Sequence, residues 1–283
     1  MSNRKILIDE KLLDNLLLKS LPQEYEVLSY THQLTEDEEE YLLILLALLY
    51  DIIESTRAWV LSLKDITNLD GLDVFFFDEM DDEIDRLFKE HFDSVIILLS
   101  MFYDTGKNVA VNELNVTPVP YVNESLLLSI IKHHNYQVIN NMLKDLSKNL
   151  RDIVWNGIKD KLDIDEIAEN LLKKGLQPIG KFTPQQRARM IAVTERSRAY
   201  NSAKLQTYHN YGVKLVDIIT AHDSKVCSIC WDNESNNPYT IEEAQDLIPT
   251  HPYCRCEYFP HLDDERYIDD LIPEDFVVDL TNY

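Results

Sequence analysis

Apolar side chains recur at steps of three and four residues in the middle of the chain, at Ile139, Met142, Leu143, Leu146, Leu150, Ile153 and Val154. This period places them on one face of a long helix. We therefore predict a helix over residues 124–155, stopped by the turn-forming pair Asn156-Gly157. Two leucine-rich stretches before it predict helices over residues 36–64 and 81–103. The polar, proline-containing stretch 104–123 predicts a connection.

Four positions place a good N-cap residue three residues before Glu or Gln, the pattern of a capping box. The pairs are Thr35 with Glu38, Asp163 with Glu166, Thr183 with Gln186, and Thr240 with Glu243. The second pair predicts a short helix that ends at Gly175. The third, followed by Pro184, predicts a helix to about Tyr211 with Gly212 as its C-cap.

After Gly212 the period changes, and the β-branched run from Val213 to Ile219 predicts a strand. Glycine occurs only six times in 283 residues, which favours long helices over short strands joined by tight turns. The fold class we expect is mainly α, with a small α+β C-terminal lobe. In residues 1–34 we expect a leucine-rich arm with a short helix over Leu12 to Leu21, ended by Pro22.

The formal net charge of −23 is unevenly distributed along the chain. Residues 1–129 and 226–283 are acidic, whereas residues 130–225 carry an excess of Lys and Arg. We therefore divide the chain into an acidic helical region (1–123), a central domain (124–262) and an acidic tail (263–283). An acidic chain repels phosphate backbones, so any contact with nucleic acid would have to come from the basic middle. The acidic first region would instead suit a basic protein partner.

Neither a secretory signal nor a membrane span is evident in the sequence. The first residues mix charges with leucine, and the longest apolar run, Tyr41 to Tyr50, is far below the roughly 20 residues that cross a bilayer. We therefore expect an intracellular chain with no membrane contact. Reducing conditions there disfavour disulfides, which makes metal binding by the four cysteines more plausible.

The cysteines fall into two groups within thirty residues of one another. Cys227-x2-Cys230 lets two sulfur atoms bind one ion from a single turn, and His251-x2-Cys254-x-Cys256 returns twenty residues later. This arrangement is typical of structural zinc. We predict Cys227, Cys230 and Cys254 as ligands of a zinc knot that closes the lobe, with His251 and Cys256 competing for the fourth position.

Two alternatives to structural zinc remain at this point: reduced thiols or a pair of disulfides, and a catalytic zinc. A catalytic ion would need an open coordination position and a nearby general base. With five protein donors for four positions, we expect a closed site and no enzymatic activity. A zinc-dependent hydrolase or nuclease is therefore the weakest hypothesis.

Several segments together resemble the phage head-morphogenesis family, the minor head proteins similar to the phage Mu F protein. They are Thr194-Glu195-Arg196, Asn201, residues 211–213, residues 220–230, and His251-Pro252-Tyr253-Cys254-Arg255-Cys256. The resemblance covers about residues 130–262. It implies a low-copy protein of the virion head interior, made in the host cytoplasm. Such a protein would associate with portal, capsid and scaffold proteins during procapsid assembly, and would take part in DNA packaging or ejection.

Residues around the cluster receive supporting roles. We expect Asp223 to accept hydrogen bonds from backbone amides in the turn before Cys227, and Asn201 to link its helix to a loop. Three kinds of partner remain open for Arg255: the cysteine thiolates, whose charge it would neutralise, a carboxylate, or a phosphate. Thr194 and Glu195 share the same predicted helix. Glu195 would pair with Arg196 or Arg198, or support the zinc lobe.

The alternative of a nucleic-acid-binding zinc module depends on basic residues of the predicted helix 184–211. They are Arg187, Arg189, Arg196, Arg198 and Lys204. Because they do not all lie on one face of a helix, the case for DNA binding is weak.

Overall fold

The structure, a computed structural model, describes residues 34–63, 77–119 and 124–261 of the chain. Its helical elements are α2 (Glu36–Ser62), α3 (Asp78–Leu114), α4 (Glu124–Lys159), α5 (Ile164–Lys174), α6 (Pro184–Asn210), α7 (Ser228–Ser235) and α8 (Ile241–Ala244). The strands are β1 (Leu215–Ile219), β2 (Tyr239–Thr240) and β3 (Glu257–Pro260). The described part is therefore mostly helical with a small C-terminal sheet, as predicted.

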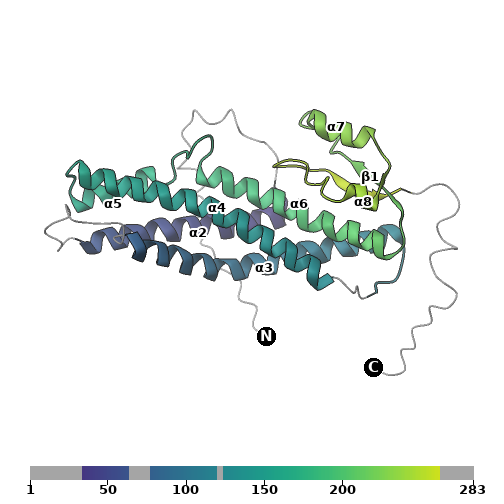
Figure 1. The fold of residues 1–283 in the computed structure, drawn as a ribbon, viewed down its shortest axis with the longest axis horizontal. Coiled ribbons are helices and arrows are strands. Elements are labelled where there is room, and N and C mark those ends of the chain that lie inside the picture. The colour runs from purple at the N-terminus through teal and green to yellow at the C-terminus, as the bar shows by residue number, and fades with distance from the viewer. Residues whose placement is uncertain (1–33, 64–76, 120–123, 262–283) are drawn as a thin grey trace, which may run out of the picture. The chain divides into compact units, whose positions relative to one another are not determined.

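The long helices α2, α3, α4 and α6 run alongside one another, and α5 packs against α2 and α4 (Figure 1). Their facing sides are built from fully buried residues such as Leu45, Leu99, Ile139 and Ala192. Helix α6 is buried on most of its circumference because it contacts α2, α3, α4 and the C-terminal lobe. An element enclosed in this way can position side chains in both the helical part and the lobe.

All four predicted capping boxes are present, each with both reciprocal hydrogen bonds. The end of α6 is also as predicted, to within one residue. Gly212 adopts φ +77°, its amide donates to the carbonyl of His209, and Val213 N–H donates to Tyr208 O. These two bonds form a Schellman motif, which turns the chain directly into the approach to β1.

Two predicted helix ends were wrong, and a glycine lies close to each. Helix α3 continues to Leu114, so the first half of the predicted connection 104–123 is helical. Helix α4 continues through Asn156-Gly157 to Lys159. In both helices the glycine is a packing position: Gly106 faces the backbone of Tyr200, and Gly157 faces Ile167. A residue with no side chain lets the two elements approach closely and does not break the helix.

The sheet is antiparallel, with strand order β2-β1-β3 and Ile218 paired with Tyr258. One face of it packs on a core to which Cys230, Cys254 and Cys256 contribute beside Tyr208 of α6. The cysteines thus replace part of an ordinary apolar core.

The boundary that we placed between residues 123 and 124 falls between two helices of one compact unit, since α3 packs closely against α4 and α6. The predicted helix at 12–21 and the acidic tail lie outside the described residues.

Candidate metal centre

The first two cysteines sit at the start of α7. Cys227 is the N-cap residue, and its sulfur accepts a hydrogen bond from the backbone amide of Cys230 at 3.4 Å. This single turn directs both sulfur atoms to the same side, with Cys230 buried and Cys227 half-buried. The local geometry is therefore the one that the C-x2-C spacing predicts.

The other three donors come from the turn that leads into β3. The backbone amide of Cys254 donates to the carbonyl of His251 at 3.0 Å, which folds the segment back on itself. Cys254 and Cys256 are 1% and 3% exposed, respectively. All four cysteines carry free thiols.

The structure brings all five predicted donors together as two overlapping groups. One group is Cys227, Cys230 and His251, and the other is Cys230, Cys254 and Cys256. Within each group the donor atoms lie within 4.8 Å of one another. Cys230 belongs to both and is therefore the centre of the cluster. The arrangement could hold a metal ion, because thiolate and imidazole in a compact, mostly buried set are donors that transition metals prefer.

His251 is oriented as a metal-binding histidine would be. Its Nδ1 lies 2.7 Å from the carbonyl oxygen of Pro252, so this nitrogen carries the proton and donates it. The lone pair of Nε2 then points at the sulfur of Cys230, 3.2 Å away. A backbone carbonyl that fixes the tautomer in this way is the usual second contact of a metal-ligating histidine.

The thiols differ strongly in acidity. A hydrogen bond from the Cys256 thiol lowers the pKa of Cys254 to about 5, whereas the pKa of Cys256 itself is raised because it is the donor. Burial raises the pKa of Cys230 to about 12. Cys254 is therefore prepared as a thiolate, the form that binds metal, and Cys256 is held as a neutral thiol beside it.

An ion pair joins the two halves of the cluster. Arg255 donates two hydrogen bonds to Asp223, at 2.6 and 2.7 Å, and Asp223 also accepts from the backbone amide of Lys225. The Arg255 guanidinium, with that amide, holds the pKa of Asp223 well below its usual range. Of the partners left open for Arg255, the structure shows a carboxylate. Asp223 accepts a backbone hydrogen bond, as expected, and ties the turn before Cys227 to the returning segment.

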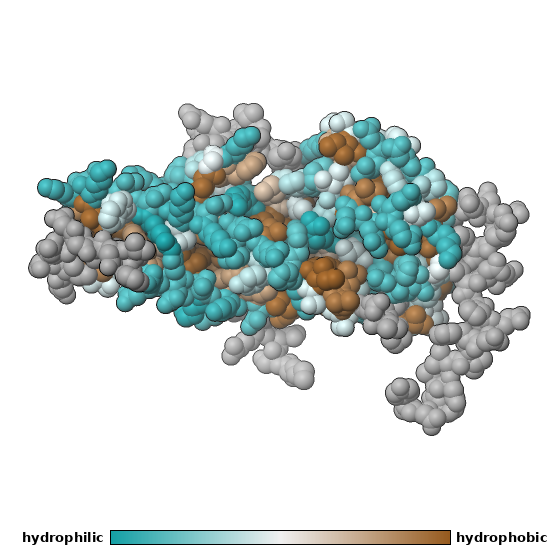
Figure 2. Space-filling model, in the orientation of Figure 1, coloured by the Kyte–Doolittle hydropathy of each residue, from teal (hydrophilic) through white to brown (hydrophobic). Residues whose placement is uncertain are grey.

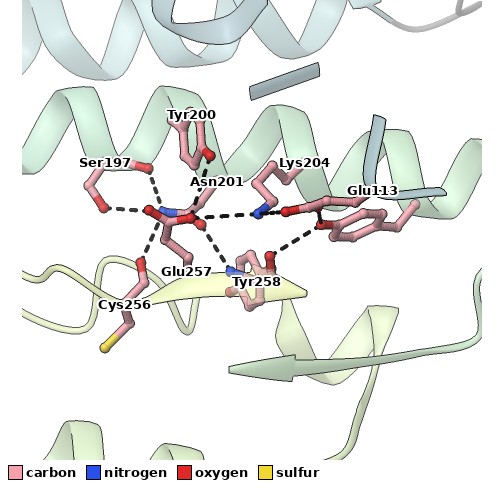
Figure 3. Close-up of polar contacts among 9 residues, drawn as sticks. Glu113, Ser197, Tyr200, Asn201, Lys204, Cys256, Glu257 and Tyr258 are labelled. Carbon is pink, nitrogen blue, oxygen red and sulfur yellow. Dashed lines mark hydrogen bonds and ion pairs between the residues drawn. The ribbon is translucent and has the colours of Figure 1, made fainter. Parts of the chain in front are cut away.

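Helix α6 holds that returning segment at two points. The hydroxyl of Thr194 accepts from the backbone amide of Tyr253 at 3.1 Å. Two turns further on, Asn201, which is 1% exposed, donates from Nδ2 to the carbonyl of Cys256 and accepts at Oδ1 from the amide of Tyr258, both at 3.2 Å (Figure 3). The positions of Cys254 and Cys256 thus depend directly on α6.

Next to Asn201 lies an ionic cluster around a buried lysine, which sequence reasoning missed. Lys204 is fully buried, and its ammonium lies 2.9 Å from Glu113 of α3 and 3.6 Å from Glu257 of β3. Tyr208 donates to Glu113, and Tyr200 donates to Glu257 (Figure 3). This cluster, which we call the Lys204 hub, connects two long helices to the strand that follows the last cysteine.

The remaining basic residues of α6 are engaged within the protein. Arg187 pairs with Asp145 at 2.5 Å, Arg198 pairs with the buried Glu195 at 3.2 Å, and the Arg196 guanidinium lies over the ring of Tyr200. Glu195 thus has the helical partner that we expected, and His134 lies 3.5 Å from it.

Neither Arg189 nor Lys204 completes a basic surface on α6. Arg189 is half-buried, and Lys204 lies in the interior, where it cannot reach a phosphate. These positions do not form the exposed basic face that the DNA-binding alternative needs.

Comparison with known families gives a match in the second half of the chain. Residues 144–259 match the family described as phage Mu protein F like protein, a span that includes all five donors, the hub residues Lys204 and Glu257, and the α6 contacts. No curated protein and no solved structure matches significantly. Among the described helices, none combines the length and hydrophobicity needed to cross a membrane. The match over residues 144–259 supports the phage Mu protein F-like family for this chain.

Proposed function

We propose that this protein is a minor component of the phage head that acts by binding other head proteins during procapsid assembly, without enzymatic turnover. The observation that carries the proposal is the family match over residues 144–259, a span that contains the whole cysteine/histidine cluster. The portal protein is the partner we propose. A place beside the portal would also allow a role in DNA packaging or ejection.

We also propose that the cluster holds one structural zinc ion, bound by Cys227, Cys230, Cys254 and His251. The orientation of His251 supports its place as the fourth ligand. Cys256 would donate its S–H to the Cys254 sulfur from outside the coordination sphere. Four protein ligands leave no open position for a substrate, which favours a structural ion. When bound, such an ion adds its binding free energy to the stability of the lobe.

The zinc proposal predicts one equivalent of zinc in protein purified under reducing conditions, measured by mass spectrometry of the metal. Chelation should lower the melting temperature because the binding energy is lost from the folded state. Cys230→Ser should abolish binding, since Cys230 belongs to both donor groups. Cys256→Ser is the matched control and should keep the ion. The proposal would be contradicted if the purified protein contained no metal and its melting temperature did not change when chelator was added.

The assembly role is tested separately, by quantitative mass spectrometry of purified procapsids and virions from the phage that encodes this chain. We expect the protein in the head fraction at low copy number, and cross-linked peptides to the portal protein. Its absence from both particles would refute the head-protein proposal without bearing on the zinc site.

A further inference from the structure

The metal centre contains five donors, one more than a tetrahedral zinc ion can bind. In the ligand set proposed above, Cys256 is the donor that remains. Cys256 is 3% exposed and lies inside the lobe, whose surface around α7 is mainly hydrophilic on the side shown in Figure 2. The packing of a small apolar side chain would explain this burial. It does not explain why the sulfur lies within 4.8 Å of the sulfur atoms of Cys230 and Cys254.

His251 and Cys256 occupy equivalent places in the two overlapping donor groups. Both groups contain Cys230; His251 completes the group with Cys227, and Cys256 completes the group with Cys254. Imidazole nitrogen and thiolate sulfur are both ordinary zinc ligands, at about 2.1 and about 2.3 Å from the ion. Once the other three cysteines hold an ion, the fourth position is therefore within reach of either donor.

Each of these two donors also has a contact to make when it is not a ligand. With His251 on the ion, Cys256 keeps its proton and donates S–H to the sulfur of Cys254. With Cys256 on the ion, His251 still donates from Nδ1 to the carbonyl of Pro252, 2.7 Å away. A proton on its Nε2 would then be donated to the sulfur of Cys230, at 3.2 Å. A hydrogen bond to a coordinated thiolate thus supports the site in both arrangements.

We propose that His251 and Cys256 are alternative fourth ligands of one zinc ion and exchange with each other. The inference rests on the zinc site proposed above and names the two ligands that alternate in it. In the exchange, the Cys256 sulfur forms a bond to zinc while the bond from His251 Nε2 breaks, and the thiol proton passes to Nε2.

The exchange leaves the charge of the centre unchanged. One thiol becomes a thiolate and one neutral imidazole becomes an imidazolium, so the ion and its five donors carry the same total charge before and after. A change of total charge in a mostly buried cluster would be costly, and none is required here. His251 lies in a half-buried turn, whereas Cys256 is enclosed at the start of β3. The turn of His251 can therefore move away without loss of the ion.

Zinc affinities of single and double variants of the full chain test the exchange, measured by competition with a chelating indicator under reducing conditions. We expect Cys256→Ser and His251→Ala each to keep one equivalent of zinc, with an affinity within about tenfold of the wild type, because the other donor takes the fourth position. The double variant has neither donor. It should bind at least about tenfold more weakly than the two single effects predict together. Cys230→Ser is the negative control, since Cys230 belongs to both donor groups. Circular dichroism checks that each variant is folded.

Cobalt(II) in place of zinc provides a second readout, because its charge-transfer absorption grows with the number of thiolate ligands. His251→Ala should show the absorption of four thiolates, and Cys256→Ser that of three. The exchange would be overturned, and the zinc site left standing, if His251→Ala lost zinc as completely as Cys230→Ser. Equal cobalt absorption in His251→Ala and Cys256→Ser would overturn it too. A wild-type chain that binds no zinc would refute the site itself and the exchange with it.

Discussion

Asn201 illustrates how much of the candidate site depends on one side chain. Its amide group pairs with the carbonyl of Cys256 and the amide of Tyr258, two backbone groups on opposite sides of a single residue. A strand that leaves a metal-binding turn has to be fixed in direction, and asparagine, which both donates and accepts, does this with one group. Its Nδ2 also reaches the carbonyl of Ser197 in the preceding turn of α6, which fixes the amide orientation.

We expect Asn201→Ala to destabilise the lobe by about 2 kcal/mol, because two buried backbone groups lose their partner. Metal affinity should also fall, by about 10–100-fold, because the segment that carries Cys254 and Cys256 is no longer held. Urea unfolding and a competition titration with a zinc indicator measure the two effects. Gln206→Ala on the same helix removes an exposed hydrogen bond to Asn210 and serves as the control. If both variants had the same stability and the same zinc affinity, Asn201 would not position the site.

At the scale of the elements, the sequence predicted where helices begin better than where they end. A capping box is a local signal, complete within four residues, and all four examples form as predicted. A glycine is ambiguous, because it can end a helix or allow a neighbour to approach. Gly106 and Gly157 do the second, and the partner in each case is a segment distant in the sequence. Only the tertiary structure distinguishes the two uses.

The two glycines face different kinds of atom, which predicts unequal effects for the same substitution. A Cβ on Gly106 would lie 2.2 Å from the carbonyl oxygen of Tyr200, a backbone atom of α6, whereas one on Gly157 would lie 2.6 Å from Cγ1 of Ile167, a side-chain atom. Gly106→Ala should therefore cost about 1–3 kcal/mol of overpacking, partly offset by about 1 kcal/mol of helix propensity. Gly157→Ala should cost less. Chemical denaturation compares them, and a larger loss for Gly157→Ala would count against close α3–α6 packing.

For the molecule as a whole, the part of the site that the sequence predicted is the part encoded by short spacings. Cys227 with Cys230, and His251 with Cys254, are each within one turn, so their cooperation could be expected before the structure. The Lys204 hub could not, since Glu113 lies 91 residues away in sequence from Lys204. A lysine on a predicted helix is ordinarily solvated, and its burial follows only when α3 and β3 enclose α6.

The Lys204 hub should couple the stability of the C-terminal lobe to that of the helical part. Lys204→Met removes the charge between Glu113 and Glu257 and leaves each carboxylate with only a tyrosine hydroxyl as partner. Because both carboxylates are partly exposed, the cost should be about 2 kcal/mol, less than for a fully buried pair. Arg86→Met is the control, because Arg86 also joins two carboxylates, Glu83 and Glu90, but on the exposed face of α3, where ion pairs contribute little.

Hydrogen exchange shows which part of the molecule is affected. In Lys204→Met the amides of β3 should exchange faster, while those in the middle of α2 remain protected, since the lobe loses its attachment to α3. Protection of β3 equal to that in the wild type would mean that the sheet and the cysteine turn hold their place without the hub.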